Sequence, residues 1–214
     1  MLTNHQKGYH RDREVIDTID EMKVLDTDQI KLLHYPSYRV AQRRLKILSD
    51  KQAISRVRES IDRPYYYYID KRTQAAHIIG INWARISLEH NKQSAYRLEM
   101  CEYEPDYDFI RPDAVISFAS TGLKKDYLTY FIEFDQSTRN RSNFDKIKKY
   151  NQLYEKTNLW RSQWWVQDYF PDILIVTETK ERQKVIEKQI ERDNKNNLVF
   201  NVRLLDRIKG ELMC

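Results

Sequence analysis

The stretch YFIEFDQSTRNRSNFDKIKKY, residues 130–150, joins an apolar segment to a lysine-rich segment through two carboxylates. Its first part is apolar and aromatic, which predicts a buried strand ending at Glu133 and Asp135. A polar loop follows, and then a predicted helix whose first turns carry Lys146, Lys148 and Lys149. Side chains two residues apart on a strand share a face. The pattern therefore predicts an ionic site where this strand ends.

The segments around this stretch show alternating helix and strand patterns. Helices are expected at 74–91, 142–158 and 180–194, and strands at 94–105, 108–119, 124–136, 172–179 and 198–206. The three consecutive strands favour an antiparallel meander, and the strand–helix–strand parts favour parallel additions. We expect an αβββαβ(αβ) domain with a mixed sheet over residues 71–214.

The first seventy residues have a different pattern. Apolar residues recur every three or four positions in 10–24, 27–35 and 37–50, which predicts three helices. Two short strand-like segments, 52–58 and 64–70, follow. Three helices and a basic hairpin predict a winged helix-turn-helix domain over residues 1–70. The third helix would enter the major groove of DNA. The chain is thus expected to be a two-domain protein of the α+β or α/β class.

Positive charge is concentrated in this first domain. Eight basic and three acidic residues lie between Arg39 and Arg63, an excess of five that equals the net charge of +5 of the whole chain. Concentrated positive charge attracts polyanions, so double-stranded DNA is the expected partner. A solvated charged surface, or a winged helix that contacts another protein, is the alternative interpretation.

The candidate DNA-binding residues come from the third helix, the hairpin and the helix after residue 145. Arginine can pair with guanine and glutamine with adenine, and lysine can contact phosphate. The candidates are Ser37, Tyr38, Arg39, Gln42, Arg43, Lys46, Arg56, Arg58, Lys148 and Lys149.

The two carboxylates gain a third neighbour from the preceding strand. Asp113 follows Arg111 and Pro112, and it can approach Glu133 if the two strands are adjacent. Carboxylates that converge repel one another unless a cation lies between them. We therefore expect a Mg²⁺ or Mn²⁺ cofactor, held by Asp113, Glu133 and Asp135. A hard divalent ion takes oxygen ligands and can activate water. Lys146 would assist by stabilising charge.

This arrangement resembles the PD-(D/E)XK nuclease superfamily over roughly residues 72–205. Pro112-Asp113 matches the first motif, and Glu133-Phe134-Asp135 stands where the family has acid, any residue, lysine. This sequence differs from the family motif in having Asp135 at the position of the lysine. Some members carry the lysine on the following helix, which fits Lys146. The resemblance implies Asp113, Glu133 and Lys146 as catalytic residues of a DNA endonuclease. It also implies a helical glutamate at Glu89 or Glu99.

The whole chain also resembles the replication-relaxation family of Gram-positive plasmids, phages and conjugative elements. The similar segments are LTNHQ, QIKLLHY, AQRRLKIL, RPDAVISF and IEFDQSTRNRSNFDKIKKYNQLY. The resemblance implies a winged helix joined to a nuclease-like domain and a role in plasmid or phage replication or mobilisation. Other replication or mobilisation proteins and a second copy of the chain are then candidate partners.

Other features exclude some functions and leave others open. No Ser-His-Asp pattern is present, and the five histidines show no metal-ligand spacing. Two distant cysteines and no long apolar run favour a cytoplasmic protein with no membrane segment.

Trp160, Trp164 and Trp165 could be core, a partner surface or a base-stacking site. A non-catalytic DNA-binding accessory protein with an inactive nuclease fold is the alternative to a metal-dependent nuclease.

Overall fold

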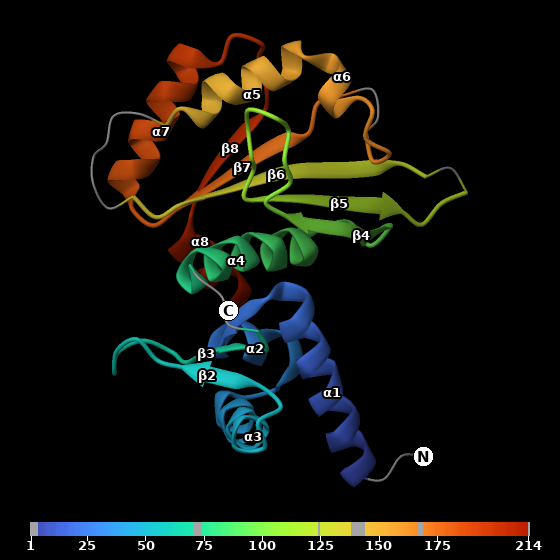
Figure 1. Ribbon diagram of the computed structural model, residues 1–214, viewed down its shortest axis with the longest axis vertical. Coiled ribbons are helices and arrows are strands. Elements are labelled where there is room, and N and C mark those ends of the chain that lie inside the picture. Colours follow the sequence, from blue (N-terminus) through green and yellow to red (C-terminus); the bar gives the residue numbers. More distant parts are fainter. Residues whose placement is uncertain (1–3, 71–73, 124, 138–143, 167–168, 214) are drawn as a thin grey trace. The chain divides into compact units, whose positions relative to one another are not determined.

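The computed structural model describes residues 4–70, 74–123, 125–137, 144–166 and 169–213. Within these ranges the protein has eight helices, a five-stranded mixed sheet and a small antiparallel sheet (Figure 1). The predicted mixed α/β class and mixed sheet are confirmed. Part of the LTNHQ segment and most of the loop before Lys146 lie outside the described residues.

The chain divides into two compact units. The division falls between Asn82 and Trp83, inside helix α4 (Ala75–Asn91). The predicted domain boundary at residue 71 adjoins residues 71–73, which lie outside the described part of the chain. None of the helices within the described ranges is both long enough and apolar enough to span a membrane.

The N-terminal unit consists of helices followed by a hairpin. Its elements before α4 are α1 (Asn4–Met22), β1 (Val24–Asp26), α2 (Thr27–His34), α3 (Tyr38–Asp50), β2 (Ser55–Val57) and β3 (Tyr66–Tyr68). The three strands pair antiparallel in the order β1-β3-β2. Tyr67 of the central strand is buried and lies opposite Leu25 on one side and Arg56 on the other.

Local sequence explains where α2 and α3 begin. Asp26 and Gln29 form a capping box in which the Asp26 carboxylate accepts from the Gln29 backbone N–H at 2.7 Å, and the Gln29 side chain accepts from the Asp26 N–H at 3.1 Å. Ser37 caps α3 by accepting from the Val40 N–H at 3.4 Å. The buried face of α3 comprises Ala41, Leu45 and Leu48. The opposite face is consequently left to solvent.

The C-terminal unit is built around the five-stranded sheet. After α4 come β4 (Tyr96–Tyr103), β5 (Ala114–Ser120), β6 (Tyr127–Asp135), α5 (Lys146–Glu155), α6 (Thr157–Trp160), β7 (Asp172–Thr177), α7 (Lys180–Asp193), β8 (Phe200–Leu204) and α8 (Leu205–Met213). The strand order follows the sequence, β4-β5-β6-β7-β8. The first three strands are antiparallel, and β7 and β8 run parallel to β6.

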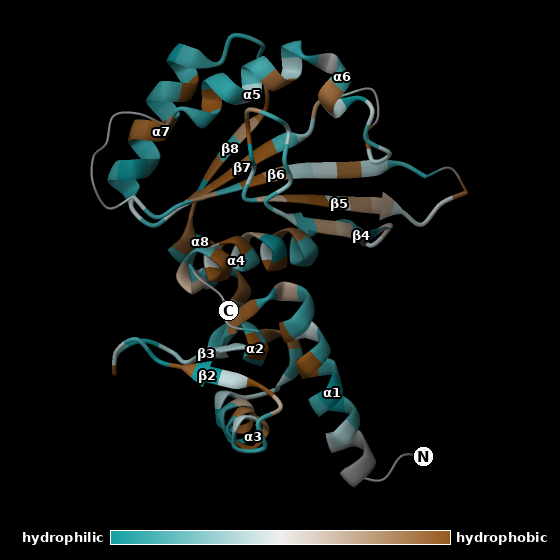
Figure 2. Ribbon diagram, in the orientation of Figure 1, coloured by the Kyte–Doolittle hydropathy of each residue, from teal (hydrophilic) through white to brown (hydrophobic). Residues whose placement is uncertain are grey.

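Helices cover one face of this sheet with a large aromatic core. Phe131 of β6 and Ile173 and Ile175 of β7 pack against Tyr150 of α5 and Ile186 of α7. In Figure 2 hydrophobic residues gather on β7 and β8, whereas α5 and α7 are largely hydrophilic. A strand alternates its side chains between faces, so Tyr130 and Leu174 point the other way, toward α4.

Some elements differ from the predicted ones. The expected strand 198–206 ends at Leu204, and the chain continues into helix α8. The expected strand 108–119 begins only at Ala114. Strand β1 was not predicted because its three residues are too few to show periodicity.

Candidate functional site

Two carboxylates and a lysine come together at the carboxyl-terminal part of β6. Strands β5 and β6 pair with Ala114 opposite Ile132, so Asp113, just before β5, lies beside Glu133. Helix α5 packs over this edge and contributes Lys146 and Tyr150, which lie one turn apart on the same helix face. We call Asp113, Glu133, Lys146 and Tyr150 the acid–lysine cluster.

Every carboxylate oxygen of this cluster accepts a hydrogen bond from the protein. Lys146 Nζ donates to Asp113 Oδ1 at 2.8 Å and also to Glu133 Oε2. Tyr150 OH donates to Glu133 Oε1 at 2.6 Å. The Phe134 backbone N–H donates to Asp113 Oδ2 at 2.7 Å. The ammonium group of Lys146 thus supplies the positive charge between the two acids.

Burial controls the charge state of this cluster. Glu133 is fully buried, and burial raises its pKa to about 8, with the Asp113 carboxylate adding to the effect and Lys146 opposing it. Burial lowers the pKa of Lys146, but the neighbouring Glu133 and Asp113 outweigh it and leave that pKa raised. Burial also raises the pKa of Tyr150 well above its usual value. Tyr150 is therefore a neutral hydrogen-bond donor.

Asp135 belongs to a separate ion pair. Arg182 of α7 donates to Asp135 Oδ2 from Nε at 2.7 Å and from Nη2 at 2.6 Å. The side chains of Asp135 and Arg182 are 8 % and 4 % exposed. Asp135 also accepts from the Ser137 N–H at 2.7 Å. The acid that stands at the family's lysine position is thus neutralised by an arginine that lies 47 residues further along the chain.

The cluster matches a divalent cation in donor type, since Asp113 and Glu133 are hard oxygen donors that converge. In the arrangement described, Lys146 contacts both acids, and the Glu133 side chain is only 1 % exposed. Within the described ranges, no group of three or more His, Cys, Asp or Glu residues is arranged to hold a metal. A metal ion would therefore have to displace the Lys146 ammonium.

The other acids and lysines predicted for this region lie elsewhere. Glu89 accepts from Arg85 Nε at 2.8 Å, and Glu99 accepts from Lys125 Nζ at 2.8 Å. Lys148 and Lys149 are exposed on α5.

The second candidate region is the exposed face of α3. Ser37, Tyr38, Arg39, Gln42, Arg43 and Lys46 are all exposed. Arg39, Gln42 and Arg43 follow the three- and four-residue spacing of one helix face. Their side chains have no hydrogen-bond or ion-pair partner among the described residues. Lys46 forms an ion pair with Asp50 at 2.6 Å.

The two hairpin arginines are held by the hairpin itself. The guanidinium groups of Arg56 and Arg58 each lie 5.2 Å from the centre of the Tyr65 ring. Arg58 also donates to the Ile61 carbonyl and, at 2.6 Å, to the Arg63 carbonyl. Arg58 is exposed and Arg56 is half-buried. These contacts of Arg58 stabilise the loop between β2 and β3.

The tryptophans divide between core and surface. Trp160 and Trp165 are buried in the aromatic core, and Trp164 is 57 % exposed. Sequence reasoning identified this group but missed Arg182, because KERQKVIEKQIERD has the appearance of a wholly solvated helix.

The structure therefore offers an exposed helix face with unpaired arginines in one unit and a buried acid–lysine cluster in the other. Comparison of the chain with protein-family models, curated proteins and solved structures found no match in any of the three.

Proposed function

We propose that the protein binds duplex DNA through the exposed face of α3, in the manner of a winged helix-turn-helix. The element order α1-β1-α2-α3-β2-β3 supports this proposal, because it places one amphipathic helix before a two-stranded hairpin. A recognition helix reads base edges in the major groove, and the hairpin contacts the adjacent backbone.

The observation that carries the proposal is the state of three side chains. Arg39, Gln42 and Arg43 are exposed, share one helix face and have no partner among the described residues. Arg44, on the same helix, is instead half-buried and paired with Asp12 of α1. Unpaired arginines and glutamine are the side chains that read guanine and adenine edges.

The biological context rests on resemblance. The segments that resemble the replication-relaxation family are the basis for proposing a role in plasmid or phage replication or mobilisation. Within that role we propose that the C-terminal unit is a PD-(D/E)XK-like domain. Its three antiparallel strands followed by a parallel strand support this assignment, since they accord with the αβββαβ order.

Metal-dependent DNA nicking is the second candidate function. The convergence of Asp113, Glu133 and Lys146 favours it, because two acids and a lysine are the catalytic residues implied by the resemblance. Mg²⁺ or Mn²⁺ bound there would activate water and stabilise charge on phosphate. Asp113 and Glu133 would hold the ion, and Asp135 would remain with Arg182. This function ranks second to DNA binding because Lys146 already compensates the charge of Asp113 and Glu133.

A binding experiment tests the first proposal. Fluorescence anisotropy would follow a labelled duplex of mixed sequence, about two helical turns long. We expect Arg39→Ala/Arg43→Ala to weaken binding by about tenfold or more. The matched control is Lys184→Ala/Lys188→Ala on α7, which removes the same charge from another exposed helix. Equal affinities in the two variants would overturn the proposal.

A cleavage experiment separates the two candidates. Supercoiled plasmid would be incubated with Mg²⁺ or Mn²⁺ and with native protein, Glu133→Gln or Asp113→Asn. Nicking by the native protein, lost in both variants while duplex binding persists, would establish the nuclease. If the native protein does not nick with either ion, the DNA-binding function stands alone.

A further inference from the structure

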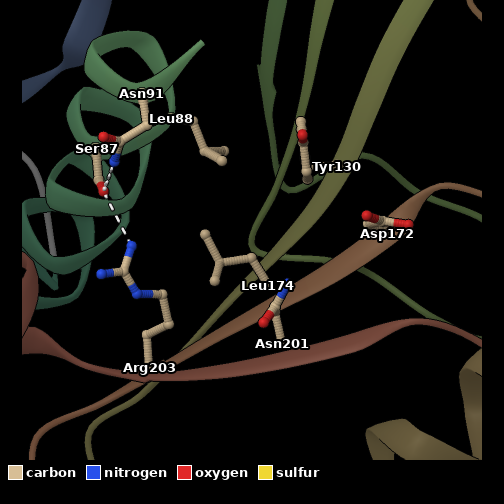
Figure 3. A pocket seen from close by; sticks show the side chains of 8 residues that line it. All are labelled: Ser87, Leu88, Asn91, Tyr130, Asp172, Leu174, Asn201 and Arg203. Atoms are coloured by element: carbon tan, nitrogen blue, oxygen red, sulfur yellow. Dashed lines mark hydrogen bonds between the residues drawn. The ribbon is translucent and has the colours of Figure 1, made fainter.

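A cavity of about 340 Å³ lies within the C-terminal unit, on the sheet face away from the acid–lysine cluster. Figure 3 shows its lining residues, which come from α4 and from strands β6, β7 and β8. They are Ser87, Leu88, Asn91, Tyr130, Asp172, Leu174, Asn201 and Arg203. This volume is at the small end of the range for ligand pockets, about 300–1,000 Å³. The cavity is therefore sized for a side chain or a small molecule.

Asp172 is the one acidic residue among those that line this cavity. Its carboxylate is half-buried, and burial raises its pKa. Within the described ranges no donor or cation contacts this carboxylate. Arg203 does not neutralise it, because the Arg203 guanidinium donates to both Glu211 oxygens, at 2.6 and 2.5 Å. A partly desolvated carboxylate without a partner is costly, and a bound cation would remove that cost.

An exposed tyrosine lies close enough to Asp172 to interact with its charge. Tyr169 is 44 % exposed, and its hydroxyl donates to the Tyr127 carbonyl. Burial raises the pKa of Tyr169 to about 12, and the Asp126 and Asp172 carboxylates add to this rise. The face of a Tyr ring attracts cations, and the neighbouring carboxylates strengthen that preference.

We propose that this cavity receives an arginine side chain from a basic peptide segment of a partner protein. Asp172 would pair with the guanidinium group, and the amide oxygen of Asn201 would accept from one of its remaining N–H groups. Leu88 and Leu174 offer apolar surface to the aliphatic stem. Phosphate does not fit beside Asp172, because the two negative charges would repel each other. The site thus has the opposite charge preference from α3.

The test is an NMR titration of the full-length protein labelled with ¹⁵N. The probe is the blocked peptide acetyl-Gly-Arg-Gly-amide, and the matched probe carries citrulline, which has the shape of arginine without its charge. We expect saturable shifts of the side-chain amide of Asn201 with the arginine peptide, at about millimolar affinity. The citrulline peptide should cause no comparable shift.

Variants make the result specific to Asp172. Asp172→Asn keeps the shape of the side chain and should weaken binding at least tenfold, about 1.4 kcal/mol. Asn201→Asp adds a second carboxylate at an exposed lining position and should strengthen binding. Glu191→Gln on α7 removes a distant exposed carboxylate and should leave binding unchanged.

Several outcomes would overturn the proposal. Equal shifts from the arginine and citrulline peptides would show a polar cavity without charge recognition. Unchanged affinity in Asp172→Asn, with the remaining amide spectrum superimposable on the native one, would remove Asp172 from the site. The absence of any shift up to the solubility limit of the arginine peptide would refute binding itself.

Discussion

Lys146 Nζ lies 2.8 Å from Asp113 Oδ1, although 33 positions separate the two residues in the sequence. The same ammonium group donates to Glu133, so one lysine compensates two carboxylates. Such a cluster remains short of one positive charge, and burial together with the Asp113 carboxylate raises the pKa of Glu133. Stability and charge state are therefore linked at this site.

Replacement of Lys146 is expected to destabilise the protein. Lys146→Met would leave Asp113 and Glu133 adjacent without a cation, and we expect the free energy of unfolding to fall by about 3 kcal/mol. That is the lower end of the range for a broken buried ion pair, because Lys146 is partly exposed. Urea denaturation measures the change. Lys149→Met, on the exposed side of the same helix, is the control and should change stability little.

The pH dependence of stability should depend on Glu133. Its pKa is raised from 4.5 to about 8 in the folded protein, so the folded state binds this proton more tightly than the unfolded state. The contribution is complete below 4.5 and is lost as the pH rises through 8. Urea denaturation of Glu133→Gln across this window should show a shallower decline than the native protein. Parallel pH profiles would contradict the assigned pKa shift.

The Asp135–Arg182 pair should show strong energetic coupling. Asp135→Ala and Arg182→Ala each leave a buried charge without its partner, and each should cost about 3–5 kcal/mol. Removing both should cost less than the sum, because neither charge then remains. A double-mutant cycle measured by urea denaturation gives the coupling energy. Additive losses would mean that the pair does not interact in solution.

Single substitutions on α3 should separate affinity from sequence reading. Lys46→Ala removes a candidate phosphate contact and should lower the slope of log affinity against log salt by about 0.9. Gln42→Ala removes a candidate base contact and should reduce discrimination between duplex sequences while leaving the salt slope unchanged. Anisotropy titrations between about 50 and 200 mM salt measure both quantities. Identical behaviour of the two variants would argue against α3 as a reading helix.

Short-range patterns predicted much of the fold. The spacing of Ala41, Leu45 and Leu48 defined the buried face of α3, and thereby the exposed face of Arg39 and Arg43. The apolar run of β7 and the order of helices and strands predicted the mixed sheet. These features depend on neighbours within a few residues, so periodicity reveals them.

Long-range pairing was less predictable. No local pattern indicates that Arg182 neutralises Asp135, because the partner comes from a helix of alternating charges. The cavity around Asp172 joins α4 to three strands, and only the folded sheet brings them together. The first two residues of α8 were taken as part of a strand because Leu204 and Leu205 continue the apolar pattern of β8.

The central claim is that the exposed face of α3 contacts duplex DNA, and photo-crosslinking tests it most directly. A photoreactive benzoylphenylalanine would replace Gln42 on α3 or, as the matched control, Glu187 on the exposed side of α7. After irradiation with labelled mixed-sequence duplex, we predict a covalent protein–DNA product at position 42 and little at 187. A duplex that still binds but crosslinks no better at position 42 than at 187 would contradict the account.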